Sequence, residues 1–540
     1  MKKEEKLKKK EKVEEEKIEK KKRHGSLFRS MVTASRQIRR FIFSRYFITL
    51  LIIVAELLLV EHLIYTIAEN MLITTSVFIV FYVVGFVHLV NRDTSPENKL
   101  TWLVVLAVPI AGTVLYFLFF DRRLSQKEIR LLVDSREQMA RFEENEIEIS
   151  DMSPHYGKIR ALLSDDTLAR VYRGTSSTFF AQGEDYFESL IKDLSEAKRY
   201  IYLEYFIIGS GKLWDRIHSI LKEKAGAGLD VRILYDDIGC MQTLPSYYEY
   251  VLRSEGIKAY RFGRVTPKLS SVHNNRDHRK IAVIDGIIGY TGGVNIADEY
   301  VNLKEKCGHW RDGGIRLYGD GTEGLLRLFL SSWDFTIGEN TDYTASFIDR
   351  EKTNEDDGGI YIPFGSGPAP VYNQKVGKNL ILNIVNQATK YVYVTTPYLI
   401  MDHELTEAFC KAVSRGVKVR IITPGVPDKR LVKVMTKSSY PYLIKSGVEI
   451  YEYLPGFIHE KTMICDDQYL ISSTINLDYR SLVHHFEDGV LVVDSPVIKG
   501  ALAAFEETIS KSDFRDQNEA KLTFIEWALR NLIKIFAPVL

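Results

Sequence analysis

A histidine and a lysine two positions apart occur in the same setting at two places in this chain. His278 and Lys280 lie in one apolar, β-branched run, and His459 and Lys461 lie in another. Alternate side chains of a β-strand leave by the same face, so each run presents an imidazole and an ammonium group to one site. Imidazole can act as a nucleophile or as a general acid or base near neutral pH, and ammonium suits a phosphoryl oxygen. One such pair would be an ordinary surface pair, but the repetition indicates phosphodiester chemistry.

The residues that follow each pair are repeated as well. Asp285 and Gly286, between two apolar runs, predict a hairpin turn that folds the next strand back towards the histidine. Asp466 occupies the matching place in the second copy. Because both aspartates lie at turns, we expect their role to be structural rather than chemical.

Small residues and an asparagine follow each turn at matched spacing. The first copy has Gly292, Gly293 and Asn295, and the second has Ser473, Thr474 and Asn476. Small residues let the backbone approach a ligand closely, and an asparagine amide can donate a hydrogen bond to developing negative charge. We therefore expect phosphate-binding or supporting roles for Gly293, Thr474, Asn295 and Asn476.

The two copies, spaced as His-x-Lys-x4-Asp-x6-Gly-Gly/Ser-x-Asn, resemble the phospholipase D superfamily. The rest of the chain, from about residue 40 onward, is similar to the bacterial cardiolipin synthase branch, including Leu-Tyr-Asp-Asp-Ile-Gly at 234–239 and Thr-Pro-Tyr at 396–398. The second copy departs from the family pattern at Ser473-Thr474, where Gly-Ser or Gly-Thr is usual.

The resemblance implies an α/β fold of two similar domains that form one active site. The catalytic set that it implies is His278, Lys280, Asp285, His459, Lys461 and Asp466. It also implies that Glu487 orients His278 and that Asp312 orients His459, each by a hydrogen bond to the imidazole of the other half. Without the resemblance, both carboxylates would be taken for surface groups on loops.

An internal repeat supports the interpretation as two similar domains. The run that begins at Ala197 parallels the run at Ala388, and the run at Gly228 parallels the run at Gly416. Strand patterns alternate with helical patterns in each half, which is typical of an α/β fold.

The chain divides into an amino-terminal membrane part and two α/β domains. In order, the sequence predicts a charged arm (1–45), membrane segments (46–68, 71–90 and 103–120), a connector (121–154), a first phospholipase D-like domain (155–348, motif 278–295), a linker (349–359), a second such domain (360–512, motif 459–476) and a carboxy-terminal amphipathic helix (513–540).

The three apolar stretches are each about long enough to cross hydrocarbon, which predicts a membrane protein. Glu56 and Glu61 make the first stretch the weakest candidate, because a carboxylate is costly at membrane depth. Basic residues in the arm and in residues 122–130 both favour the cytoplasmic side, which requires an even number of crossings. We therefore expect the first stretch, or the first two together, not to span independently. Residues 91–100 are expected to form a loop, and the α/β domains to lie on the cytoplasmic side of a bacterial cell membrane.

Composition and spacing argue against several other classes of protein. The chain has 540 residues and a net charge of +1, and its basic excess is confined to the first 45 positions. The cysteines stand in no disulfide or metal-ligand spacing and are expected to be free thiols; they are Cys240, Cys307, Cys410 and Cys465. No His/Glu pair has zinc-helix spacing and no glycine-rich loop ends in Gly-Lys-Ser/Thr, so we expect neither a metal nor another cofactor.

The resemblance implies a phosphatidyltransferase that condenses two phosphatidylglycerol molecules into cardiolipin and glycerol through a phosphohistidine. Its expected partners are phosphatidylglycerol, other anionic phospholipids and the membrane. The alternative is a phosphodiesterase of the same fold that acts as a lipase or nuclease, although the membrane segments and the lack of a basic, aromatic groove disfavour nucleic acid. An inactive membrane scaffold is a remote alternative, because both His-Lys pairs are intact.

Overall fold

The computed structural model describes the carboxy-terminal two thirds of the chain most fully. The described residues are 79–91, 96–108, 126–141 and 168–516, without 265–274, 349–352, 354, 369–370 and 373, and with the isolated residues 58, 62, 76, 112, 115, 116 and 163. The charged arm, most of the first predicted span and residues 517–540 lie outside the described residues. The chain divides into two compact units, one mainly of Met1–Asp93 and Trp102–Phe120 and the other mainly of Asp121–Thr266 and Ser270–Leu540.

Residues 79–91 of the amino-terminal unit are helical and overlap the predicted span 71–90, which ends one residue earlier. Their apolar side chains are largely exposed; Val80, for example, is 60% exposed and Phe81 is 56% exposed. Inside this unit, His88 Nδ1 lies 2.7 Å from the hydroxyl of Tyr116. Among the residues described, no helix combines the length and apolar character that a bilayer crossing needs.

Two expectations for this region are corrected. The predicted loop at 91–100 is wrong in its second half, because helix α3 (Pro96–Leu106) begins there. Proline suits the first turn of a helix, where its missing N–H would have no intrahelical partner. The predicted span 103–120 is also interrupted, since α3 ends at Leu106 and a turn follows at 107–108. Val108 precedes a proline, and that position disfavours helical backbone.

The larger unit contains two mixed β-sheets with the same strand order. The first sheet runs β1 (Thr175–Phe180), β8 (Gly314–Gly319), β6 (Ile288–Gly292), β5 (Lys280–Ile284), β2 (Tyr200–Tyr205), β3 (Asp230–Asp236) and β4 (Lys258–Phe262). The second runs β9 (Ile360–Ser366), β18 (Glu487–Val493), β16 (Tyr469–Ser473), β15 (Thr462–Cys465), β10 (Tyr391–Thr395), β12 (Lys418–Pro424) and β13 (Glu449–Tyr453), and ends in β19 (Ser512–Arg515). The expected α/β fold with an internal repeat is confirmed, because the paralleled runs form β2 and β10, then β3 and β12.

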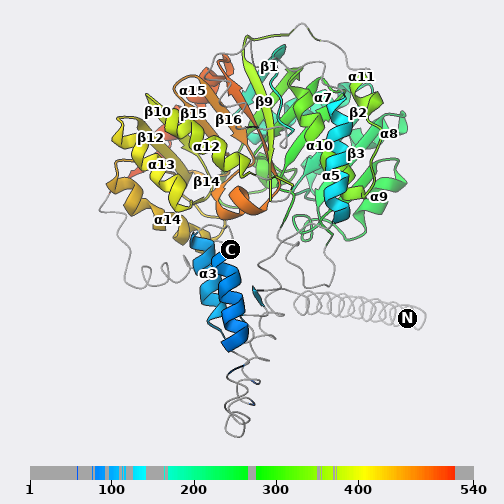
Figure 1. Ribbon diagram of the computed structural model, residues 1–540. Helices are drawn as coiled ribbons and strands as arrows, with labels where there is room; N and C mark the ends of the chain where they lie inside the picture. The colour runs from blue at the N-terminus through cyan, green and yellow to red at the C-terminus, as the bar shows by residue number, and fades with distance from the viewer. Residues whose placement is uncertain are drawn as a thin grey trace, which may run out of the picture. The chain divides into compact units, whose positions relative to one another are not determined.

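Helices cover the outer face of each sheet and fill the space between the two sheets. The outer helices are α7 (Gly183–Glu196), α8 (Lys212–Gly226) and α9 (Tyr248–Ser254) on the first sheet, and α12 (Val376–Gln387), α13 (His403–Ser414) and α14 (Arg430–Lys445) on the second (Figure 1). A third core cluster joins the two halves through α10 (Thr322–Ile337) and α15 (Val497–Ser510). The remaining short helices are α11 (Thr344–Ile348), η4 (Asp298–Val301) and η5 (Arg480–His484). Each sheet is thus buried on both faces, which explains its near-continuous apolar strands.

The structure revises the edges of this unit. The expected connector at 121–154 contains α5 (Gln126–Ala140), whose Met139 carbonyl accepts a hydrogen bond of 2.7 Å from Arg327 of α10. The amphipathic helix expected at 513–540 is wrong for its first residues, because β19 pairs there with β13. A sheet edge has unpaired backbone N–H and C=O groups. Hydrogen bonding to this edge stabilises the short segment more than its weak helical pattern stabilises a helix. The four cysteines are free thiols, as expected.

Two matched hairpin turns fix the strands that carry the repeated residues. The turn at Asp285 joins β5 to β6, as predicted, and the turn at Asp466 joins β15 to β16. The Asp285 carboxylate accepts hydrogen bonds of 2.8–3.0 Å from three backbone N–H groups at 198–200, where β2 begins. The Asp466 carboxylate does the same at 389–391, at 2.7–2.8 Å. Both aspartates therefore tie a turn to the neighbouring strand.

Replacing Asp466 with Asn is expected to lower stability by about 1–3 kcal/mol, because charge-assisted bonds to partly buried backbone N–H groups are lost. Burial alone would raise the pKa of Asp466, but the backbone hydrogen bonds from Tyr391 and Thr389 lower it below its ordinary value. This stabilisation is therefore present at neutral pH and is lost as the pH falls through the lowered pKa. The midpoint of thermal inactivation measures the change, with the exposed Asp467→Asn as the matched control. Lost turnover at an unchanged midpoint would instead indicate a chemical role.

Candidate functional site

Short pairs of backbone segments carry each repeated histidine across the boundary between the halves. Strand β14 (Gly456–Ile458) of the second half pairs in parallel with β7 (His309–Arg311) of the first. Directly after β14, the N–H of His459 donates to the carbonyl of Arg311 at 2.7 Å. The other histidine is held in the same way with the halves exchanged, since the N–H of His278 donates to the carbonyl of Phe486 at 2.8 Å. The backbone of each histidine is therefore hydrogen-bonded to a segment of the other half.

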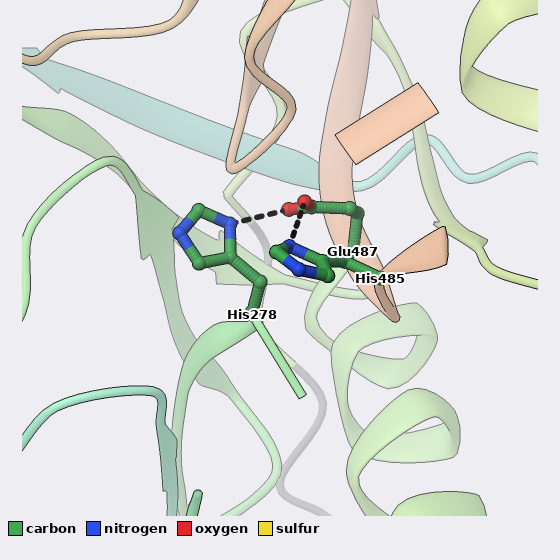
Figure 2. A group of neighbouring side chains, drawn as sticks. All are labelled: His278, His485 and Glu487. Carbon is green, nitrogen blue, oxygen red and sulfur yellow. Dashed lines mark hydrogen bonds and ion pairs between the residues drawn. The ribbon is translucent and has the colours of Figure 1, made fainter. Parts of the chain in front are cut away.

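This pairing brings each imidazole to a carboxylate of the opposite half. The Nδ1 of His278 lies 2.8 Å from Glu487 Oε2 (Figure 2), and the Nδ1 of His459 lies 2.6 Å from Asp312 Oδ2. All four side chains are buried. A carboxylate accepts the Nδ1 proton and leaves the Nε2 lone pair of a neutral imidazole free to react. The contacts that the resemblance implied are thus present in the structure, while the catalytic roles remain predictions.

The two lysines place positive charge at the same site. Lys280 Nζ donates to the carbonyl of His278 at 2.6 Å, and Lys461 Nζ donates to the carbonyl of His459. Lys461 Nζ also lies 2.8 Å from His459 Nδ1. Burial lowers the pKa of Lys280 to about 8 and that of Lys461 to about 7. A bound phosphodiester would supply the negative charge that favours both ammonium forms.

Burial also dominates the titration of the imidazoles and of Asp312. The pKa values of His278 and His459 are lowered well below 6.5 by burial first and by the neighbouring lysines next. Burial raises the pKa of Asp312 to about 6, although Lys461 acts in the opposite direction. Without substrate, both imidazoles are therefore held neutral, which is the form a nucleophile requires.

Gly293 is needed because Asp312 approaches its backbone closely. A Cβ atom on Gly293 would lie 2.1 Å from Asp312 Oδ1 and 2.9 Å from the carbonyl of His459. Thr474 stands at the matching position in the second half, where its hydroxyl donates to Glu487 Oε2 at 2.5 Å. Thr474 therefore gives Glu487 a side-chain hydroxyl donor, whereas Gly293 has no side chain to offer Asp312.

The two asparagines are buried beside the site. Asn295 accepts a hydrogen bond from the N–H of Ile207 at 3.0 Å and donates to the hydroxyl of Tyr300 at 2.7 Å. Asn476 Oδ1 has no hydrogen-bond partner among the described residues. Direct phosphate contacts by these amides, and by Gly293 and Thr474, remain predictions.

Several buried polar residues around His278 were missed in the sequence. Glu204 and Asp277 are fully buried, and burial raises the pKa of both, to about 6 for Asp277. Arg279 lies 3.7 Å from Glu204, and its guanidinium donates to Tyr372 at 2.9 Å. A charged residue in an otherwise apolar strand, as at Glu204, was the available signal. The other residues that sequence reasoning missed are Asp488, which accepts from Thr291 Oγ1 at 2.5 Å, and His485, which lies beside Glu487.

This chain is similar to known proteins over most of its length. A family model described as "Cardiolipin synthase, PLD-like domain" matches residues 190–308 and 381–509, and one described as "Phospholipase_D-nuclease N-terminal" matches residues 80–119. An uncharacterized protein of Streptococcus mutans is 37% identical, with 84% of this chain and 99% of the relative covered. A cardiolipin synthase of Halalkalibacterium halodurans is 33% identical over 78% of this chain and 83% of the relative. The crystal structure of a phosphatidylserine synthase of Haemophilus influenzae has a TM-score of 0.54 at 15% identity, covering 72% of this chain and 98% of that one, which supports the fold.

Thr474→Val is expected to lower kcat/KM by about ten- to a hundredfold, because it removes a hydrogen bond to a charged carboxylate without changing side-chain shape. Thr474→Ser keeps the hydroxyl and should remain within a few-fold of the natural protein. Steady-state kinetics at neutral pH measure the difference. Equal rates for the valine and serine variants would show that the hydroxyl does not hold Glu487.

The pH profile of kcat/KM is expected to fall as the pH rises through the pKa values of Lys461, about 7, and Lys280, about 8. This parameter reports the free enzyme, in which deprotonation removes the charge that binds phosphate. The acid limb should lie below pH 6.5, because His278 stays neutral down to its lowered pKa. A basic limb that begins well above pH 8, or an acid limb above pH 6.5, would contradict this electrostatic account.

Proposed function

Because the chain belongs to the cardiolipin synthase family of the phospholipase D superfamily, we propose that it condenses two phosphatidylglycerol molecules into cardiolipin and glycerol. The observation that carries the proposal is the pair of cross-half contacts, His278 with Glu487 and His459 with Asp312. Two buried imidazoles with two ammonium groups suit an exchange of one alcohol for another on phosphorus.

In the first half-reaction, Nε2 of His278 attacks the phosphorus of one phosphatidylglycerol. The bond from phosphorus to the glycerol oxygen breaks, and His459 donates its Nε2 proton to the departing oxygen. This step requires imidazolium at His459. Burial first and the lysine charges next lower the pKa of His459 in the empty site, and the negative charge of the bound phosphodiester favours its protonated form. The product is a phosphatidyl-histidine, with glycerol free to leave.

In the second half-reaction, His459 is neutral and removes a proton from a glycerol hydroxyl of the second phosphatidylglycerol. That oxygen attacks the phosphorus, and the bond to His278 Nε2 breaks. Lys280 and Lys461 stabilise the negative charge on the phosphoryl oxygens in both steps. Glu487 holds the proton of His278 Nδ1 throughout, so the nucleophile returns in the tautomer from which it started.

The lipid substrates suit a chain that sits at a membrane. We place it in a bacterial cell membrane, with several amino-terminal segments in the bilayer and the catalytic unit on the cytoplasmic side. The exposed apolar side chains of residues 79–90 support contact with lipid. The basic residues of the arm and of 122–130 support the assignment of the side.

Purified protein supplied with labelled phosphatidylglycerol in EDTA is expected to give cardiolipin and glycerol in equal amounts. The lysines and amides provide the electrostatic stabilisation that a divalent ion provides in many phosphoryl-transfer sites. Separation of the lipid products measures the outcome. Phosphatidic acid as the main product would indicate hydrolysis, and a chemical step that only a specific metal restores would contradict metal independence.

The two histidines are expected to be unequal when each is replaced by alanine. His278→Ala should form no covalent intermediate, because the nucleophile is gone. His459→Ala should still be loaded by a phosphatidyl ester whose leaving group needs no proton. Acid-labile, base-stable lipid label on the denatured protein reports the intermediate. Label on the His278→Ala protein and none on the His459→Ala protein would reverse the roles.

A further inference from the structure

A third imidazole stands beside the nucleophile, and the phosphatidyl transfer does not use it. His485 is 9% exposed, and its ring centroid lies 5.5 Å from that of His278. Its Nδ1 lies 3.6 Å from Glu487 Oε1. Among the described residues, neither of these two buried atoms has a hydrogen-bond partner. Figure 2 shows both imidazoles turned towards the same carboxylate.

The separations of these atoms suit a bound cation. Two imidazole nitrogens and a carboxylate oxygen form a set that zinc binds in proteins, at about 2.0–2.2 Å from each atom. Tetrahedral ligands at such bond lengths stand about 3.3 Å apart. Glu487 Oε2 lies 2.8 Å from His278 Nδ1 and Glu487 Oε1 lies 3.6 Å from His485 Nδ1, so the carboxylate faces both nitrogens at separations close to that spacing. One ligand atom from each of the three residues can be chosen within 4.8 Å of the others.

The other half of the molecule provides an internal comparison. Trp310 packs on His459 with centroids 5.6 Å apart and planes at 45°, and His485 packs on His278 at 5.5 Å and 45°. The two residues hold equivalent places, each two positions before the orienting carboxylate. An indole has no lone pair for a metal, so the residue that matches His485 on the His459 side cannot be a ligand.

We propose that His278, His485 and Glu487 form an inhibitory site for a transition-metal dication such as Zn²⁺. The inference rests on the proposed function in one respect, because phosphatidyl transfer is the activity that the bound metal inhibits. A metal on His278 Nδ1 takes that lone pair, so the single proton of the neutral imidazole moves to Nε2. Nε2 then has no lone pair for phosphorus, and the protein is inactive until the metal leaves.

Nearby charges limit how tightly the cation is held. Lys280 and Lys461 act on His278 electrostatically, and Arg480 acts on His485. All three oppose a dication, whereas Glu487 is the only carboxylate of the three-residue set. The site therefore binds more weakly than a structural zinc site and releases its metal to a chelator.

The test compares the full-length natural protein with His485→Asn and His485→Trp, each measured against its own metal-free rate. Buffered Zn²⁺ should inhibit the natural protein reversibly, and both variants should need at least about tenfold more free Zn²⁺, since one of three ligands is lost. Titration with Co²⁺ gives a readout that is independent of turnover. The visible absorption of low-symmetry Co²⁺ should appear with the natural protein and be absent from both variants.

Two results would overturn the proposal. Equal Zn²⁺ sensitivity of the natural protein and both variants would place the inhibition on lipid headgroups or on the cysteines, which all three proteins share. A natural protein without Co²⁺ absorption, or with absorption that both variants retain, would show that His485 is not a ligand. Failure of the lipid-transfer activity itself would leave the Co²⁺ comparison interpretable, so the two proposals fail separately.

Discussion

The site depends on backbone pairing between the two halves. β14 lies beside β7, and the N–H of His278 reaches the carbonyl of Phe486, so each histidine is fixed by a segment that the other half supplies. The carboxylates follow directly after these segments, at Asp312 and Glu487. Orientation of both imidazoles is therefore a consequence of docking the halves, and the buried core around α10 and α15 holds that docking in place.

The two halves repeat the fold but differ beside the histidines. Asp312 lies so close to Gly293 that no side chain fits there. Glu487 is longer, and its Oε2 contacts both the Thr474 hydroxyl and His278 Nδ1. Trp310 faces His459 where His485 faces His278. These substitutions give two imidazoles of the same origin different surroundings, which suits a mechanism that needs one nucleophile and one acid or base.

Much of this arrangement could be predicted from the sequence. A spacing of residues that occurs twice indicates a function, even where the function of each residue alone is ambiguous. The His-Lys pairs, the hairpin turn at Asp285 and the repeated strands follow from local patterns. The partnership of His278 with Glu487 spans 209 positions and came only from resemblance to a family. Glu204, His485 and the strand β19 were missed, because their roles depend on neighbours that the fold brings from elsewhere. The local sequence pattern also predicted a loop at 91–100, whereas α3 begins there at Pro96.

The central claim is that each imidazole is oriented by a carboxylate from the other half. Its most direct test is the rate of covalent loading by an activated phosphatidyl ester in a His459→Asn background, where only His278 can react. The account predicts that Glu487→Gln slows loading by about ten- to a hundredfold, because it removes the charged partner of His278. Asp312→Asn should slow loading much less than Glu487→Gln, because its own imidazole partner is already absent and only its effect on the lysines is lost. Loading slowed by Asp312→Asn and unaffected by Glu487→Gln would contradict the cross-half pairing.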